Sequence, residues 1–139
     1  MKQLYLVLLL VAASSLFSCK KYIQQQEEKA VIAAVTNGVW YVQEYLQNDS
    51  NITASFSGYL FQFNENGTVV GTRDSVSVNG VWVGDITAGT ITANFPGAGE
   101  PLKNLNEIWH ITNSSTTFVV ANSTDTTNKT TNILQLQKQ

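Results

Sequence analysis

The sequence has few of the residues from which disulfides, metal sites and nucleic-acid surfaces are built. It holds one cysteine, Cys19, and one histidine, His110, in 139 residues. A single cysteine excludes an internal disulfide, and with one histidine it cannot form a structural zinc site. Charged residues make up 13% of the chain, and the formal net charge is −2. Because nucleic-acid binding selects clustered Lys and Arg, the few scattered basic residues argue against it.

Motifs for catalysis, calcium binding and phosphate binding are also missing. No Gly-x-Ser-x-Gly elbow or Asp-x-Asp-x-Asp-Gly run occurs, and Gly97-Ala98-Gly99 lies between prolines and reads as a turn. His110 follows Trp109 in an alternating segment, where a half-buried strand residue is far more common than a catalytic base. Glu44 and Glu107 would need to face each other across a cleft to act as an acid pair, and we expect both on the solvent face. We therefore predict no enzyme activity, no cofactor and no metal.

The N-terminus carries a targeting pattern. Lys2 precedes an apolar run at residues 4–13, and residues 16–19 read Leu-Phe-Ser-Cys. The run is shorter than the roughly 20 residues that cross a bilayer, so it indicates a secretory signal peptide. An ordinary signal with an incidental cysteine is the alternative, although one unpaired cysteine is unusual in a secreted chain. The segment resembles the lipobox of bacterial lipoproteins, and the resemblance implies removal of residues 1–18, acylation of Cys19 and anchoring in the cell envelope, at the outer membrane.

The sequence predicts three parts. Residues 1–18 form the signal peptide, residues 19–36 a lipidated tether with a short helix, and residues 37–139 a β-domain. The helix is expected at residues 24–35, where small apolar residues recur at helical spacing. Asn37-Gly38 then favours a left-handed cap that ends it.

Short alternating segments from residue 39 onward predict β-strands. In residues 58–63, for example, Tyr59, Phe61 and Phe63 share one face. Asn66-Gly67 indicates a hairpin, and Asn79-Gly80 indicates a bulge or a second tight bend. Residues 122–131 read as a polar loop or flap. The predicted strands span residues 39–46, 58–63, 68–73, 76–83, 90–95, 105–112, 117–121 and 132–138.

These eight consecutive strands predict an all-β fold, a small antiparallel up-and-down barrel preceded by a short N-terminal helix. A barrel removes exposed sheet edges, and eight strands leave room for filling side chains or for one small ligand. No alternation of strands and helices supports a parallel sheet. A β-sandwich of similar size is the alternative.

Several motifs resemble lipocalins. Gly38-Val39-Trp40 is similar to the family's Gly-x-Trp motif, and the domain as a whole resembles the lipocalin-like domains of Bacteroidetes lipoproteins. The other matching features are the strand at residues 59–63, the hairpin at residues 66–68, Gly80-Val81-Trp82 and the Trp109 strand. The resemblance implies an eight-stranded barrel with Trp40 closing one end. Lipocalins also place an Arg from the final strand on this Trp, where the present sequence offers Lys138.

The aromatic residues carry the functional prediction. They either fill the barrel or line one end of a pocket for an apolar ligand, which an inward polar residue would orient. We predict a membrane-anchored lipoprotein that binds a small apolar molecule without catalysis and has no nucleic-acid partner. The alternative is a filled barrel whose rim loops, at residues 47–57, 96–104 and 122–131, bind a protein or glycan. The predicted ligand-binding residues are Trp40, Phe61, Phe63, Arg73, Trp82, Trp109 and His110.

Overall fold

The computed structural model describes residues 20–21, 23–125, 127 and 129–139. The chain divides into two compact units, Met1–Val31 and Ile32–Gln139. In the first unit, residues 23–31 are helical and exposed, and in the second unit residues 32–36 are helical. This confirms the predicted short helix. The predicted signal peptide and Cys19 lie outside the described residues.

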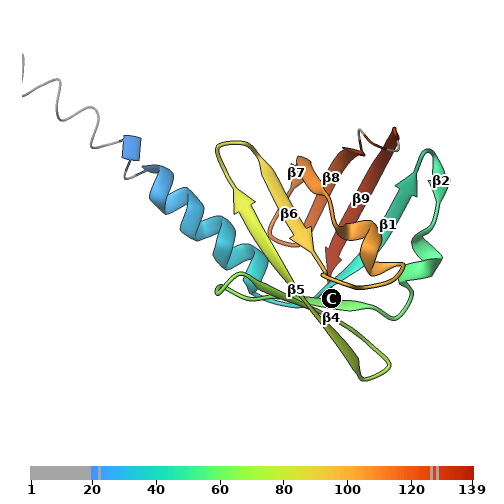
Figure 1. Cartoon of the computed structure of the whole chain (residues 1–139). Coiled ribbons are helices and arrows are strands. Elements are labelled where there is room, and N and C mark those ends of the chain that lie inside the picture. Colours follow the sequence, from blue (N-terminus) through green and yellow to red (C-terminus); the bar gives the residue numbers. More distant parts are fainter. Residues whose placement is uncertain (1–19, 22, 126, 128) are drawn as a thin grey trace, which may run out of the picture. The chain divides into compact units, whose positions relative to one another are not determined.

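The second unit contains a closed antiparallel barrel (Figure 1). Eight of the nine strands among the described residues form its wall, and β1 pairs with β9 to close it. The predicted up-and-down barrel is confirmed, and closure rules out the sandwich. The strands are β1 (Trp40–Gln47), β2 (Ser50–Asn51), β3 (Leu60–Phe63), β4 (Thr68–Arg73), β5 (Val76–Asp85), β6 (Thr90–Asn94), β7 (Ile108–Ser114), β8 (Phe118–Asp125) and β9 (Thr130–Lys138).

The alternation of side chains along β1 determines which of its residues face the barrel interior. Trp40, Val42 and Tyr45 are all buried, although the step from 42 to 45 breaks the period of two. The register with β9 shifts between Val42 and Glu44, so an extra residue restores the phase and turns Tyr45 inward. Glu44 therefore lies on the opposite face from Tyr45, as expected from the sequence.

Two glycines show how the hairpins are built. Gly67 adopts φ 84°, which only glycine tolerates well, and the amide of Thr68 bonds the Asn66 side chain, so the predicted Asn-Gly hairpin is confirmed. The bulge or bend predicted at Gly80 was wrong, because β5 pairs with β4 through Gly80 without a register shift. A Cβ at Gly80 would stand 2.6 Å from the Asn94 carbonyl oxygen. Glycine is needed there for a close approach rather than for a turn.

At the other end of the barrel the sequence-based prediction was wrong, because polar residues there form strands rather than a loop. Residues 122–131 were expected to form a loop, but β8 continues to Asp125 and β9 begins at Thr130. Ser123 is buried within this extension, and so is its pairing partner Asn132 in β9. Two of the expected loops contain short 3-10 helices, η1 (Thr53–Phe56) and η2 (Leu102–Leu105), and β7 begins after η2 rather than at residue 105.

Candidate functional site

The barrel interior holds an apolar cavity of about 50 Å³. Aromatic and aliphatic side chains from seven of the strands, the last helical turn and η2 surround it. An engineered cavity of about 150 Å³ accommodates benzene or xenon, so this void is smaller than benzene requires without movement of its walls. Its lining consists of Val35, Trp40, Phe61, Phe63, Val69, Ile91, Ala93, Phe95, Leu105, Trp109, Ile111, Val119, Ala121, Leu134 and Leu136.

Four of the predicted ligand-binding residues meet at this cavity. Trp40, Phe61, Phe63 and Trp109 line it, and each is less than 10% exposed. They come from β1, β3 and β7, and alternation directs their side chains inward in each strand. The structure thus brings together the central part of the predicted aromatic set.

The remaining three predicted residues lie elsewhere. Trp82 is buried, but it packs against Phe63 outside the cavity lining and donates a hydrogen bond from Nε1 to the Asn64 carbonyl oxygen at 2.9 Å. Arg73 lies over the Tyr59 ring, 4.3 Å from its centroid, at the end of β4. His110 is exposed, because it follows the inward-facing Trp109. Neither Arg73 nor His110 is therefore the inward polar residue that the sequence suggested.

Trp40 anchors the last helical turn to the barrel. Its Nε1 donates to the Val35 carbonyl oxygen at 2.8 Å, and Gln62 donates from Nε2 to the Thr36 carbonyl oxygen at 3.1 Å. Lys138 Nζ lies 5.1 Å from the Trp40 ring centroid. The final strand thus supplies a cation to this ring as the lipocalin resemblance implies, with Lys in place of Arg.

The cavity wall is not equally buried on all sides. Trp40, Phe61, Val69 and Phe95 are at most 2% exposed. On the side formed by β6 to β9, several lining residues are only half-buried. They are Ile91, Ala93, Ile111, Val119 and Leu136. The aliphatic side from β6 to β9 is therefore where the cavity comes nearest to solvent.

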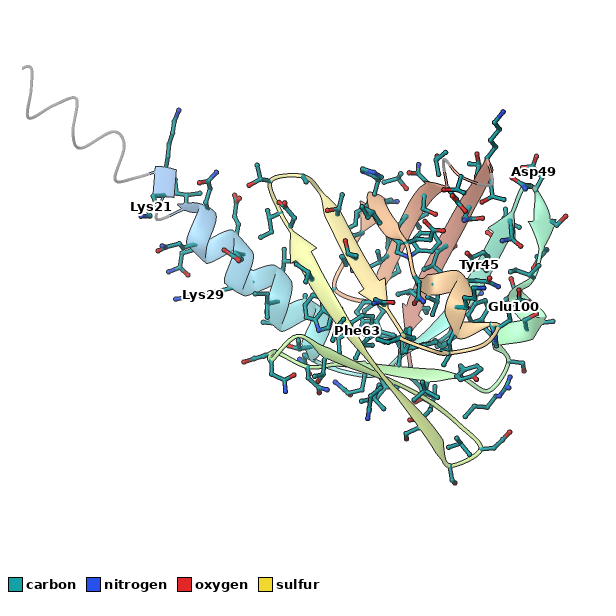
Figure 2. All side chains as sticks on the ribbon, in the orientation of Figure 1. Lys21, Lys29, Tyr45, Asp49, Phe63 and Glu100 are labelled. Carbon is teal, nitrogen blue, oxygen red and sulfur yellow. The ribbon has the colours of Figure 1, made fainter. Side chains whose placement is uncertain are left out.

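A polar group that the sequence did not reveal lies at the η2 end of the barrel. Figure 2 shows the Tyr45 side chain beside η2, and its hydroxyl donates to the Asn104 carbonyl oxygen at 2.7 Å. Burial, followed by the negative charge of Glu107, raises the pKa of Tyr45 far above its usual range. Burial, followed by the charge of Asp125, raises the pKa of Glu107. The charge of Glu107 therefore disfavours ionisation of the Tyr45 hydroxyl. Contrary to expectation, Glu107 does not face solvent alone.

Two buried polar residues belong to the same end of the barrel. Asn132 donates from Nδ2 to Ser123 Oγ at 3.3 Å, while Asn132 Oδ1 has no partner among the described residues. Ser123 lies two residues after the inward-facing Ala121 in β8, and Asn132 lies two residues before the inward-facing Leu134 in β9, so both point into the barrel. That phase was the available signal in the sequence, but the polar composition of the segment concealed it.

Within the described part of the chain, no group of three or more His, Cys, Asp or Glu residues is placed to hold a metal ion. The helical segments there are also too short or too polar to qualify as membrane spans.

Comparisons with known proteins bear on the fold. No family model and no curated protein matches the sequence. The solved structure of a DUF4847 family protein from Bacteroides vulgatus matches 78% of this chain and 99% of its own, with a TM-score of 0.55 and 18% identity. An odorant-binding protein matches 76% of this chain and 73% of its own, with a TM-score of 0.42 and 16% identity. Identities this low show the fold alone, and that fold is a closed antiparallel up-and-down β-barrel.

Proposed function

We propose that this protein is a non-catalytic binding protein for a small apolar molecule held inside the barrel. The cavity in the barrel interior carries the proposal, because its lining is apolar and five aromatic side chains converge on it. Transfer of an apolar ligand from water into such a cavity is favourable, and no buried polar group on the lining would lose its hydrogen bonds. A volume of about 50 Å³ favours a ligand of only a few heavy atoms, or one that displaces the half-buried wall.

The test is a titration with apolar molecules of increasing size, followed by methyl NMR. Xenon, cyclopropane and benzene provide the series. We expect saturable shifts at Val119, Leu134 and Leu136 with the smaller probes, and weaker binding of benzene because the wall must move to admit it. No saturable shift with any of the probes would reject an internal binding site.

The second candidate is an interaction module with an essentially filled barrel. The small cavity favours it, and so do exposed aliphatic residues on the outer face. Val83 and Ile108 are 65% and 57% exposed, and both pair with Thr92 in the intervening strand, so they form neighbours across three strands. If the titration gives no internal binding, substitution of Val83 and Ile108 by Thr should abolish capture of the protein partner.

We further propose that residues 1–18 are a signal peptide and that acylated Cys19 anchors the protein in the cell envelope, at the outer membrane. The support is the basic, apolar and Leu-Phe-Ser-Cys pattern of the N-terminus. Mass spectrometry of the mature N-terminal peptide tests this proposal. A diacylated or triacylated Cys19 is expected, and an unmodified thiol with residues 1–18 still attached would contradict it.

A further inference from the structure

A second hollow lies in the barrel wall where β6 and β7 separate. The pairing of the two strands ends at Thr92↔Ile108. One further backbone hydrogen bond, from the Ala93 amide to the Glu107 carbonyl oxygen, is long at 3.4 Å. The hollow has a volume of about 340 Å³ and opens to solvent. It therefore interrupts the wall on the side where the apolar cavity comes nearest to solvent.

The lining of the hollow shows that it lies within the wall rather than on one face of it. The lining consists of residues 92–94 and 106–108, three consecutive residues from each side of the gap. Successive side chains of a strand point to opposite faces, so the exposed Ile108 and the inward-facing Ala93 border the same space. Ala93 belongs to the linings of both the hollow and the apolar cavity. The hollow therefore meets the cavity at one small side chain.

The Asn106 side chain holds the far end of this gap together. Its Oδ1 accepts from the Phe95 amide at 2.6 Å, and its Nδ2 donates to the Phe95 carbonyl oxygen at 3.4 Å. Asn106 thus takes the place of a backbone partner for Phe95, and it is not part of the cavity lining. Because these bonds come from a side chain, they can break while the two strands stay paired elsewhere. The gap can then widen without unfolding of the barrel.

The other sides of the cavity are closed more firmly. On the side of β3 and β4, Phe61 and Val69 are at most 2% exposed. At the helical end, Val35 lines the cavity, and its carbonyl oxygen accepts from Trp40 Nε1 at 2.8 Å. Gln62 Nε2 donates to the next carbonyl oxygen along the helix at 3.1 Å. A ligand that entered at this end would have to displace a helical turn held by two elements.

We propose that the hollow between β6 and β7 is the entrance to the apolar cavity, and that Ala93 is the residue past which the ligand moves. This inference rests on the proposed binding of an apolar ligand and adds the route of that ligand and a limit on its width. An unbranched alkyl chain or a small atom passes one alanine side chain once the Asn106 bonds break, whereas a bulky ring requires wider separation of the strands.

The test measures the rates of xenon exchange by ¹²⁹Xe saturation-transfer NMR, together with the equilibrium affinity. Asn106→Ala removes both bonds to Phe95, so association and dissociation should each accelerate roughly twofold to tenfold while the affinity stays the same. The matched control is Gln62→Ala, which removes an amide bond to the last helical turn and should leave both rates unchanged. In a second pair, Ala93→Gly should accelerate association, whereas Ala121→Gly, which removes a methyl group from the cavity lining in β8, should not.

Each other outcome overturns the inference in a distinguishable way. Acceleration in Gln62→Ala but not in Asn106→Ala would place the entrance at the helical end. Equal acceleration in both variants, or in neither, would show that exchange does not depend on this gap. Equally fast association in Ala93→Gly and Ala121→Gly would reject Ala93 as the residue that limits passage. If xenon binds but its rates follow any of these patterns, only the entrance is rejected, whereas absence of xenon binding rejects the proposed function and the entrance together.

Discussion

Replacing Ala121 with valine should fill the cavity from the β8 wall. Ala121 is 3% exposed and lines the void, so two added methyl groups would project into empty space rather than into packed atoms. Residual cavities cost about 24 cal/mol for each Å³, so filling about 50 Å³ is worth about 1.2 kcal/mol. Valine also suits a strand better than alanine.

Two opposite effects should follow in one variant. We expect the free energy of unfolding of Ala121→Val to rise by about 1 kcal/mol, which raises Tm by roughly 4 °C in a domain of this size. Saturable xenon binding should disappear because its volume is occupied. Thr124→Val is the control, since it places a valine on the exposed face of the same strand and should leave xenon binding intact.

Denaturant unfolding and xenon titration of both variants measure these effects. Destabilisation of Ala121→Val by more than about 1 kcal/mol would show that the wall is already packed, because overpacking has that sign and size. Xenon binding that survives the substitution would show that the ligand site is somewhere other than this cavity. Either result would refute the reasoning from cavity volume.

Three further substitutions test the fold and its electrostatics. Gly80→Ala should lower the free energy of unfolding by at least about 2 kcal/mol, because its Cβ would meet the Asn94 carbonyl oxygen at 2.6 Å, whereas Gly84→Ala, with no contact closer than 3.5 Å, should cost much less; urea titration compares them. Trp40→Phe should cost about 2 kcal/mol or more in the same assay, because it leaves a buried carbonyl acceptor of the last helical turn without its donor. Glu107→Gln should raise Tm near neutral pH, because the raised pKa of Glu107 means that its ionised form is less stable in the folded chain than in the unfolded one. That gain should vanish below about pH 4, where the carboxyl is protonated in both states, and a constant Tm difference across this range would contradict the assignment.

Much of the barrel could be predicted from local pattern. Period-two alternation of large apolar residues identified the strand that carries Phe61 and Phe63, and Asn66-Gly67 identified its hairpin, because both signals depend on neighbouring residues alone. The extension of β8 through Asp125 could not be predicted in this way. Its inward residues are polar, and the strand is evident only from their pairing with β9 in the folded chain.

The aromatic residues at the centre of the candidate site could be predicted from the sequence, but the cavity itself and the polar residues around it could not. Inward aromatic residues such as Trp40 and Trp109 follow from strand phase. Whether they leave a void depends on packing between strands distant in sequence, which no local pattern reports. The charges that surround Glu107 are likewise invisible in the local pattern, since Tyr45 and Asp125 come near it only in the folded chain.

The central claim, that the barrel carries a small ligand, is tested most directly by native mass spectrometry of the mature protein isolated gently from its own host. The account predicts a reproducible additional mass beyond any acyl groups on Cys19, lost on denaturation and corresponding to a small apolar molecule. A bare protein mass, together with no saturable uptake of xenon, would contradict it and favour the filled-barrel interaction module.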